Sequence, residues 1–229
     1  MDQDTLLLAA ILIPCLIVAI VFHEVAHGWV ANALGDPTAK EKRRLSLNPL
    51  RHVDPIGTVV LPGFLALTGA PVFGWAKPVP VNFRRLNHPR RDMMAVAAAG
   101  PGTNILLALI GAVLLGLAAH GLSAPPDGLL GAVVLGLNYF IVINIFLALF
   151  NLLPLPPFDG SHIVEGLLPP HLARQYARLR PLGLGLLIIM LLVIPWLFPG
   201  LGIVENVVLP PVEWASGIFM GLANAIAGQ

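Results

Sequence analysis

Two histidines and a glutamate stand together near the start of the chain, in the run His23-Glu24-Val25-Ala26-His27. Histidines four residues apart lie one turn from each other on the same face of a helix, so both imidazoles can reach one metal ion. A carboxylate beside the first histidine can take a proton from a water that this metal activates. The pattern predicts a zinc hydrolase site with His23 and His27 as ligands and Glu24 as the general base.

This motif lies inside an apolar stretch that extends from Thr5 to Leu34. At the centre of a bilayer, one charged side chain costs about 2.5–3.5 kcal/mol on insertion scales. A glutamate and two histidines so close together need compensation there, and a bound cation would provide it. Polar side chains that merely line a helix–helix contact are the alternative interpretation.

A His-Glu-x-x-His pair leaves a tetrahedral site incomplete, so another part of the chain must supply a third ligand. The candidate is the segment Asn151–Gly160, whose prolines break a helix where the chain should still be at membrane depth. Non-helical backbone at that depth has to line a cavity. Asp159 in this segment offers a hard oxygen ligand suited to zinc, and His162 is its rival. We favour Asp159, with one zinc per chain, and expect His162 to form a hydrogen bond near the surface.

The other polar candidates fit ordinary structural roles. Cys15 lies two turns before His23 and is expected to be a small packing residue. As the single cysteine it can form no internal disulfide. The remaining histidines stand in predicted loops beside Pro, Gly or Arg and are expected to be exposed: His52, His88, His120 and His171.

The composition is that of a membrane protein. Of the 229 residues, 57% are hydrophobic and 11% are charged, whereas a soluble domain carries about 25% charged residues. We expect no cleavable signal peptide, because the start Met1–Asp4 is acidic and the first apolar run carries the metal motif. The formal net charge of +1 is uninformative, and we expect no nucleic-acid partner.

Apolar runs are the elements that must position the site. They are Thr5–Leu34, Ile56–Ala70, Met93–Ala119, Leu129–Leu153, Leu182–Phe198 and roughly Ile203–Ala227. A span needs about 20 apolar residues. The second run is shorter, with Pro62-Gly63 at its centre, and indicates a re-entrant or interfacial hairpin. We predict an all-α polytopic membrane protein with about five transmembrane helices, plus a re-entrant or β-like hairpin between the first and second spans.

The distribution of charge supports this count. All 13 Lys and Arg residues fall between Lys40 and Arg91 or between Arg174 and Arg180. If the second run does not cross, every basic residue is on one face, which the positive-inside rule makes the cytoplasm. The sequence thus predicts an integral protein of the cell membrane, with the N-terminus outside and the C-terminus cytoplasmic.

The first helix should enter the cytoplasm near Gly35-Asp36-Pro37, a helix-stop signal. His27 is seven residues and His23 eleven residues before Leu34. At about 1.5 Å per residue, the pair would lie roughly 10–16 Å below the cytoplasmic face. A metal at this depth is inside the membrane yet reachable by water from the cytoplasm.

A second motif, Gly100-Pro101-Gly102-Thr103-Asn104, follows three alanines. The small residues allow another helix to approach closely, and Pro101 should kink the segment. Asn104 would then face the bundle, either in an interhelical hydrogen bond or in support of a metal ligand.

The segment Pro71–Phe83 should be extended, because prolines at positions 71, 78 and 80 forbid a helix. An edge strand beside the metal could hold an unwound substrate peptide by strand addition. An interfacial loop with Trp75 as an aromatic anchor is an equal alternative.

The two motifs, followed by Asn151-x-x-Pro154-x-x-Pro157-x-Asp159-Gly160, resemble the site-2 protease family of intramembrane zinc metalloproteases. They occur in the family's order and cover about residues 5 to 165. The resemblance implies a three-helix catalytic core, zinc held by the positions matching His23, His27 and Asp159, and Glu24 as general base. It also implies that Asn151 lies near the scissile peptide and assists substrate binding or oxyanion stabilisation. The chain resembles a minimal member with neither a PDZ insertion nor a CBS domain.

These features together predict a zinc-dependent endopeptidase that cleaves a transmembrane helix or signal segment near the cytoplasmic side. We expect one membrane domain over residues 1–229, with the catalytic core at about 5–165 and C-terminal helices at about 182–227. Its partners would be a single-pass membrane protein or signal-peptide substrate and membrane lipid, and a homo-oligomer is left open. A divalent-metal transporter is the alternative, since intramembrane His and Glu also mark ion pathways. Transporters usually show repeated halves, and neither the His-Glu-x-x-His motif nor the full Asn-x-x-Pro-x-x-Pro-x-Asp-Gly motif recurs here.

Overall fold

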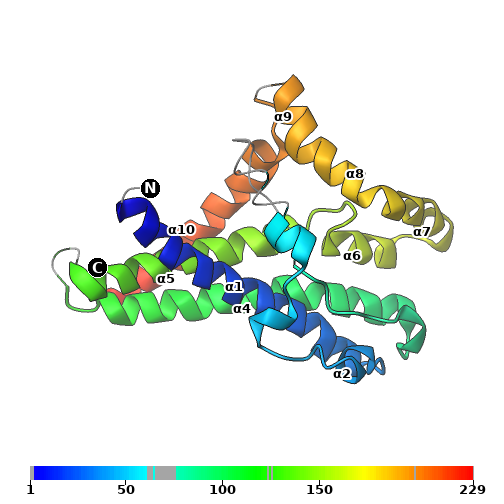
Figure 1. The fold of residues 1–229 in the computed structure, drawn as a ribbon, viewed down its shortest axis with the longest axis horizontal. Coiled ribbons are helices and arrows are strands. Elements are labelled where there is room, and N and C mark those ends of the chain that lie inside the picture. The colour runs from blue at the N-terminus through cyan, green and yellow to red at the C-terminus, as the bar shows by residue number, and fades with distance from the viewer. Residues whose placement is uncertain are drawn as a thin grey trace.

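The structure is a computed structural model that describes residues 3–60, 64, 76–122, 124, 126–198 and 200–228. Within these residues the regular secondary structure is helical, with no β-strand. Three long helices form the centre of the molecule: α1 (Gln3–Ala33), α4 (Pro89–Ala119) and α5 (Gly128–Asn151). A fourth, α10 (Leu209–Ala227), packs against α4 and α5 (Figure 1).

Shorter elements surround this bundle. Between α1 and α4 lie α2 (Thr38–Glu41), η1 (Pro49–Arg51), η2 (Pro55–Val60) and η3 (Phe83–Arg85). After α5 come α6 (Asp159–Leu167), α7 (Pro170–Tyr176), η4 (Ala177–Leu182), α8 (Gly183–Ile188), η5 (Ile189–Val193), α9 (Ile194–Leu197) and η6 (Val204–Val208).

Among the described residues, four helical segments are long and apolar enough to cross a membrane: Leu6–Ala33, Pro89–Ala119, Gly128–Asn151 and Pro170–Leu197. Large apolar side chains on their outer faces, such as Leu106 and Leu117, are exposed. A bilayer would solvate such side chains, whereas water would not. The prediction of an all-α polytopic membrane protein is confirmed at this level. The count of about five spans and the hairpin stay predictions.

Small residues let the helices approach closely. A Cβ added at Gly111 would lie 3.0 Å from the Ile141 side chain on α5. One added at Gly116 would lie 2.6 Å from the Ala223 carbonyl oxygen on α10. Since lipid tails are as apolar as leucine, such close van der Waals packing is what associates helices in a membrane. Helix α4 therefore has neighbours on several faces and forms the centre of the bundle.

The predicted helix stop after the first span is confirmed. Helix α1 ends at Ala33 and Gly35 has a φ of 104°, a left-handed conformation that glycine adopts without strain. The Asp36 N–H then donates to the Ala31 carbonyl over 2.8 Å, which is the Schellman arrangement. The chain turns here and returns along α4, since the Asn87 N–H donates to the Leu34 carbonyl over 2.9 Å.

The predicted hairpin and extended segment fall partly outside the described residues. Of the run Ile56–Ala70, the structure describes residues 56–60 and 64, and Pro55–Val60 form η2. Of the segment Pro71–Phe83, residues 76–82 are described and are not helical. Trp75 lies outside the described part of the chain.

The two ends of the described chain lie at the same end of the bundle (Figure 1). His120, just after α4, donates from Nδ1 to the Ile226 carbonyl at the end of α10, over 3.1 Å. The predicted orientation, with the N-terminus outside and the C-terminus cytoplasmic, stays a prediction. Helices α8 and α9 lead away from the bundle, and α10 runs in the same direction as α4.

Candidate metal centre

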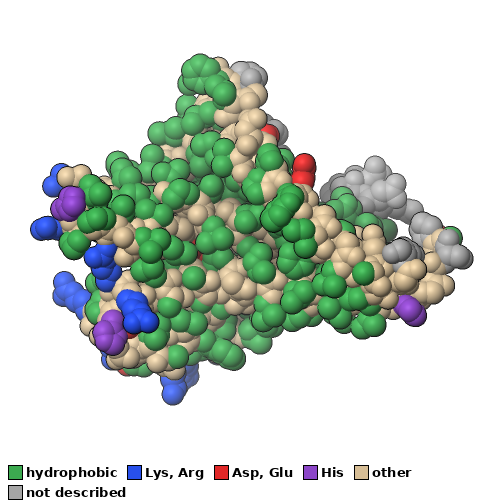
Figure 2. All heavy atoms as spheres, turned by 180° about the vertical axis from the view of Figure 1, so that it is seen from behind, with side chains coloured by type: hydrophobic (Ala, Val, Ile, Leu, Met, Phe, Trp, Pro, Cys, Tyr) green, Lys and Arg blue, Asp and Glu red, His purple; other side chains and the backbone are tan. Residues whose placement is uncertain are grey.

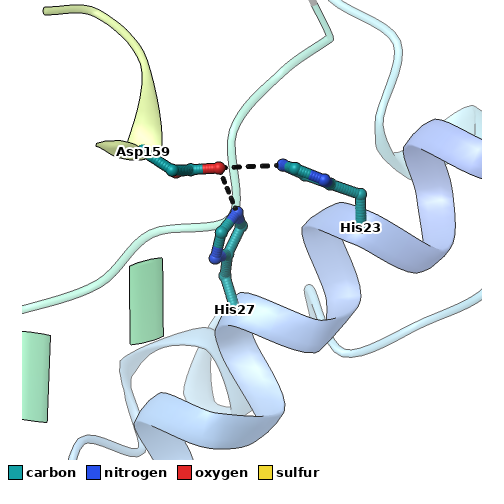
Figure 3. A group of neighbouring side chains, drawn as sticks. All are labelled: His23, His27 and Asp159. Carbon is teal, nitrogen blue, oxygen red and sulfur yellow. Dashed lines mark ion pairs between the residues drawn. The ribbon is translucent and has the colours of Figure 1, made fainter. Parts of the chain in front are cut away.

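Helices α1 and α6 bring the three predicted ligands together. The Nε2 atoms of His23 and His27 lie 3.1 and 3.3 Å from the same oxygen, Oδ2 of Asp159 (Figure 3). Both histidines are buried, with exposed fractions of 7% and 8%. Among the described His, Cys, Asp and Glu residues, these three form the group that could hold a metal ion. The rival His162 is not part of it.

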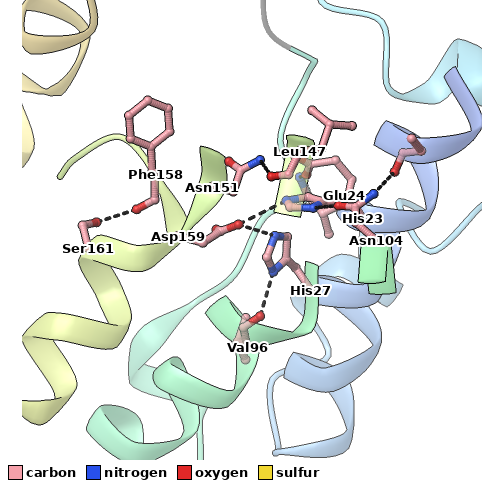
Figure 4. Close-up of polar contacts among 12 residues, drawn as sticks. His23, Glu24, His27, Val96, Asn104, Leu147, Asn151, Phe158, Asp159 and Ser161 are labelled. Atoms are coloured by element: carbon pink, nitrogen blue, oxygen red, sulfur yellow. Dashed lines mark hydrogen bonds and ion pairs between the residues drawn. The ribbon is translucent and has the colours of Figure 1, made fainter. Parts of the chain in front are cut away.

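Hydrogen bonds hold each imidazole by its other nitrogen. His27 Nδ1 lies 2.7 Å from the carbonyl oxygen of Val96, and His23 Nδ1 lies 2.6 Å from Oδ1 of Asn104 (Figure 4). A carbonyl oxygen can only accept, so each Nδ1 carries the hydrogen. In the neutral imidazole the Nε2 atom is then unprotonated, which is the form that binds a metal.

The site fits a cation in its donor set and spacing. Two nitrogen lone pairs face Asp159 Oδ2, a buried oxygen with no hydrogen-bond partner. Three acceptors at such short separation repel one another unless a positive charge lies between them. With bonds of about 2.0–2.2 Å, neighbouring ligands of tetrahedral zinc are about 3.3 Å apart. The observed nitrogen–oxygen distances of 3.1 and 3.3 Å match this spacing, and zinc fits the residues present.

Gly100 on α4 allows this arrangement. A Cβ added there would lie 2.5 Å from His27 Nε2 and 2.6 Å from His23 Nε2. The backbone of α4 thus lies directly against the two imidazoles. We predicted that small residues here serve helix packing. The structure shows that the packing partners include the candidate metal ligands themselves.

The loop after α5 places Asp159. Helix α5 ends at Asn151, and α6 begins at Asp159. A Cβ added at Gly160 would overlap the Leu152 carbonyl oxygen, so only glycine lets the start of α6 pack this closely on the end of α5. The Phe158 ring packs against Phe150 with centroids 4.6 Å apart. These contacts direct the Asp159 side chain toward α1.

Glu24 and Asn151 lie beside the ligands without joining them (Figure 4). The Glu24 Oε2 atom accepts a hydrogen bond of 2.8 Å from the Val79 N–H, so the non-helical segment 76–82 lies against the motif helix. The Asn151 Nδ2 atom donates to the Leu147 carbonyl over 2.9 Å. In this conformation the amide group of Asn151 is engaged within its own helix.

The expectations for the other polar residues are mostly confirmed. His88, His120 and His171 are exposed, and Cys15 is half-buried, with Sγ 3.6 Å from the Gly136 carbonyl. The expectation is wrong for His52, which is 3% exposed. Its Nε2 atom bonds to the Ser46 carbonyl over 2.8 Å, because the loop folds back on itself. Sequence reasoning also missed Asn144, a fully buried residue that contacts Asn104; a polar residue inside an apolar span was its signal.

Comparisons with known proteins agree with this site. Residues 130–194 match the model of the family described as peptidase family M50. YwhC of Bacillus subtilis (strain 168), provisionally named a zinc metalloprotease, is 46% identical over 164 residues, 69% of each chain. Rip2 of Mycobacterium tuberculosis (strain ATCC 25618 / H37Rv), with the same provisional name, is 30% identical over 193 residues, 80% of this chain and 70% of that protein. No solved structure matches this chain with comparable significance.

Proposed function

Because the chain belongs to peptidase family M50, the site-2 proteases, and is a zinc metalloprotease, we propose that it hydrolyses a peptide bond within the membrane. The substrate would be a transmembrane helix or retained signal segment, cut near the cytoplasmic side. The observation that carries the proposal is the position of the metal centre. His23 and His27 lie within the candidate span Leu6–Ala33, and both are buried against α4.

The chain's own residues would divide the chemistry as follows. When bound, zinc supplies Lewis acidity, which polarises the scissile carbonyl and acidifies the attacking water. The Val79 N–H holds Oε2 of Glu24, and the other carboxylate oxygen accepts the proton of the water. Glu24 then delivers this proton to the leaving amine. Asn151 turns its amide from Leu147 toward the substrate and donates to the carbonyl oxygen as charge develops.

The segment 76–82 is proposed to hold the substrate in extended form. A peptide bond in a helix is shielded by its own hydrogen bonds, so the substrate must unwind before cleavage. Segment 76–82 is non-helical and lies against Glu24 through the Val79 N–H. Its backbone could pair with the unwound peptide by strand addition.

The molecule's charge distribution supports one orientation in the membrane. Lys and Arg side chains gather at one end of the visible face in Figure 2, and hydrophobic side chains cover most of the rest. The positive-inside rule would place this end in the cytoplasm. A cavity of about 220 Å³ lies there between α4, α6 and α7, and His162 on the α6 helix that carries Asp159 lines it. The cavity would give water a place next to the helix that carries the third ligand.

Cleavage by the purified protein in lipid vesicles would test the function. Wild-type protein should contain one zinc and cleave a single-pass substrate. His23→Ala, His27→Ala and Asp159→Ala should each lose zinc and activity, because each removes one of three ligands. Glu24→Gln should keep the metal and lose activity, since a base is not a ligand.

Two results would contradict these roles. Loss of zinc in Glu24→Gln would make Glu24 a ligand, and full activity in that variant would remove it from the chemistry. Zinc uptake into sealed vesicles without peptide cleavage would favour the transporter instead.

A further inference from the structure

A chain of buried amides connects the metal centre to the middle of α5. Asn104 on α4 and Asn144 on α5 are both fully buried. Asn104 Nδ2 donates to Asn144 Oδ1 over 2.8 Å and to the Ala19 carbonyl over 3.2 Å. Asn144 Nδ2 donates in turn to the Phe140 carbonyl over 2.8 Å. The three helices of the bundle thus meet in one hydrogen-bonded network behind His23.

Backbone carbonyls determine the direction of every hydrogen bond in this network. The Phe140 carbonyl can only accept, so it holds the Nδ2 side of Asn144 and turns Oδ1 toward Asn104. Asn144 Oδ1 and the Ala19 carbonyl then both require donors, which the Asn104 Nδ2 group supplies. Asn104 Oδ1 is left facing His23 Nδ1 at 2.6 Å. The neutral His23 ring therefore carries its hydrogen on Nδ1 and presents a bare Nε2 to the metal.

The two histidines differ in how this tautomer is held. For His27 the acceptor is the Val96 carbonyl, which cannot reverse its polarity. For His23 the acceptor is a side-chain amide, whose oxygen and nitrogen exchange places when the group rotates by half a turn. A rotated Asn104 would present Nδ2 to His23 Nδ1 and favour the tautomer with hydrogen on Nε2, which cannot bind the metal.

We propose that Asn144 is a positioning residue for zinc binding: it prevents rotation of Asn104 and thereby keeps His23 in the metal-binding tautomer. Asn144 touches neither the ligand atoms nor the proposed substrate and acts through Asn104. The inference rests on the metal site of the proposed function. It adds a residue of α5 that lies seven positions before Asn151.

Zinc affinity, measured by competition with a chelator on purified protein, tests this proposal. Asn144→Leu keeps the size of the side chain and removes the acceptor, and it should weaken zinc binding about 10- to 100-fold, as expected for a residue that orients a ligand. Asn144→Asp should restore most of the affinity. As a neutral acid it can donate to the Phe140 carbonyl and accept from Asn104, which reproduces both hydrogen bonds.

Asn138→Leu is the matched control. Asn138 lies on the same helix and its Nδ2 donates to the Val134 carbonyl over 2.8 Å, so the variant loses the same kind of bond to the preceding turn. It should bind zinc as tightly as wild type. Wild-type affinity in Asn144→Leu would overturn the proposal. So would equal weakening in Asn138→Leu, or no recovery in Asn144→Asp. Wild-type protein without any zinc binding would instead refute the proposed function.

Discussion

At the candidate metal centre, each imidazole is hydrogen-bonded through Nδ1 and faces Asp159 through Nε2. His27 is tied to a backbone carbonyl and His23 to an amide side chain, so both present Nε2 to Asp159. With neutral imidazoles the three acceptors converge on one point, an arrangement that a bound cation stabilises. The same closeness leaves little room for a Cβ at Gly100 on the facing turn of α4.

Gly100→Ala should weaken zinc binding by about 10- to 100-fold, because overpacking costs about 1–3 kcal/mol. Its Cβ would lie 2.5 Å from His27 Nε2 and push the imidazoles apart. Gly102→Ala is the control, since nothing lies within 4 Å of its added Cβ. Chelator competition would measure both. Equal zinc affinity in the two variants would show that α4 yields to the added methyl group.

Asn151→Ala should lower turnover by about 100- to 1000-fold, the usual effect of losing one donor to a developing oxyanion. Zinc content and thermal stability should stay close to wild type. Asn138→Ala is the control, because Asn138 makes the same bond to the fourth preceding carbonyl as Asn151 does. Loss of metal in Asn151→Ala would mean that the residue holds the Asp159 loop in place, and the catalytic role would be wrong.

At the scale of elements, the segment that follows α1 is held by hydrogen bonds to the Asp36 carboxylate. Asp36 is fully buried, and its carboxylate accepts from the backbone N–H groups of Thr38 and Asn82, at 3.0 and 2.5 Å. Asn82 ends the same segment whose Val79 N–H holds Glu24. The turn at the end of α1 therefore positions the backbone that lies beside Glu24, the proposed general base.

Asp36→Ala should speed hydrogen exchange at the Val79 amide by about 10- to 100-fold, since hydrogen bonds to a charged group are worth about 1.5–3 kcal/mol. Zinc content should not change. Asp54→Ala is the control: Asp54 accepts from the Ile56 and Gly57 N–H groups at the start of η2. Unchanged exchange in Asp36→Ala would show that other contacts hold the segment.

The hydrogen bonds to the Asp36 carboxylate also predict that protection of the Val79 amide depends on pH. Burial acts to raise the pKa of Asp36, but hydrogen bonds from Thr38 and Asn82 and the charge of Arg85 lower it below its ordinary value. A carboxyl whose pKa is depressed in the folded state stabilises the fold at pH values above its ordinary pKa of about 3.9. This stabilisation is lost as the pH falls through the pKa of the folded state. Protection of the Val79 amide, corrected for intrinsic exchange, should thus persist at neutral pH and fall only below about pH 4.

The whole molecule is organised around α4. Helices α1 and α5 run antiparallel to it, whereas α10 runs in its direction and ends beside His120. The basic side chains gather at the opposite end from these termini (Figure 2). A chain with its basic end in the cytoplasm would then expose both termini on the outer side.

Cysteine labelling would test this topology in a background where the native Cys15 is replaced by alanine. Cysteines at Ser46 and Asn87 should react only from the cytoplasmic side, and those at Ala124 and Gly228 only from outside. The physical reason is that α4 and α10 end together. Labelling at Gly228 from the cytoplasmic side would instead place the two termini on opposite sides of the membrane. Labelling of Ser46 and Asn87 from different sides would show that the intervening apolar run crosses.

Much of the site follows from short-range patterns in the sequence. Four-residue spacing puts His23 and His27 on one helix face because the α-helix has 3.6 residues per turn. Three prolines within four residues, Pro154, Pro156 and Pro157, prevent a helix from continuing, so the broken segment that carries Asp159 was also predictable. The end of α1 at Gly35 depends on one glycine and the bonds of a single turn. These features need no information about distant residues.

Only the tertiary structure decided which distant groups meet. Asn104 could have served packing or a ligand, and the choice depends on how α4 is rotated against α1 and α5. The direction of α10 depends on how it packs against α4, and a hydropathy pattern carries no such information. In lipid every face of these helices is apolar, so periodicity does not mark the packed side. Small residues and buried amides decide it, through van der Waals contact and hydrogen bonds that exist only once the helices are assembled.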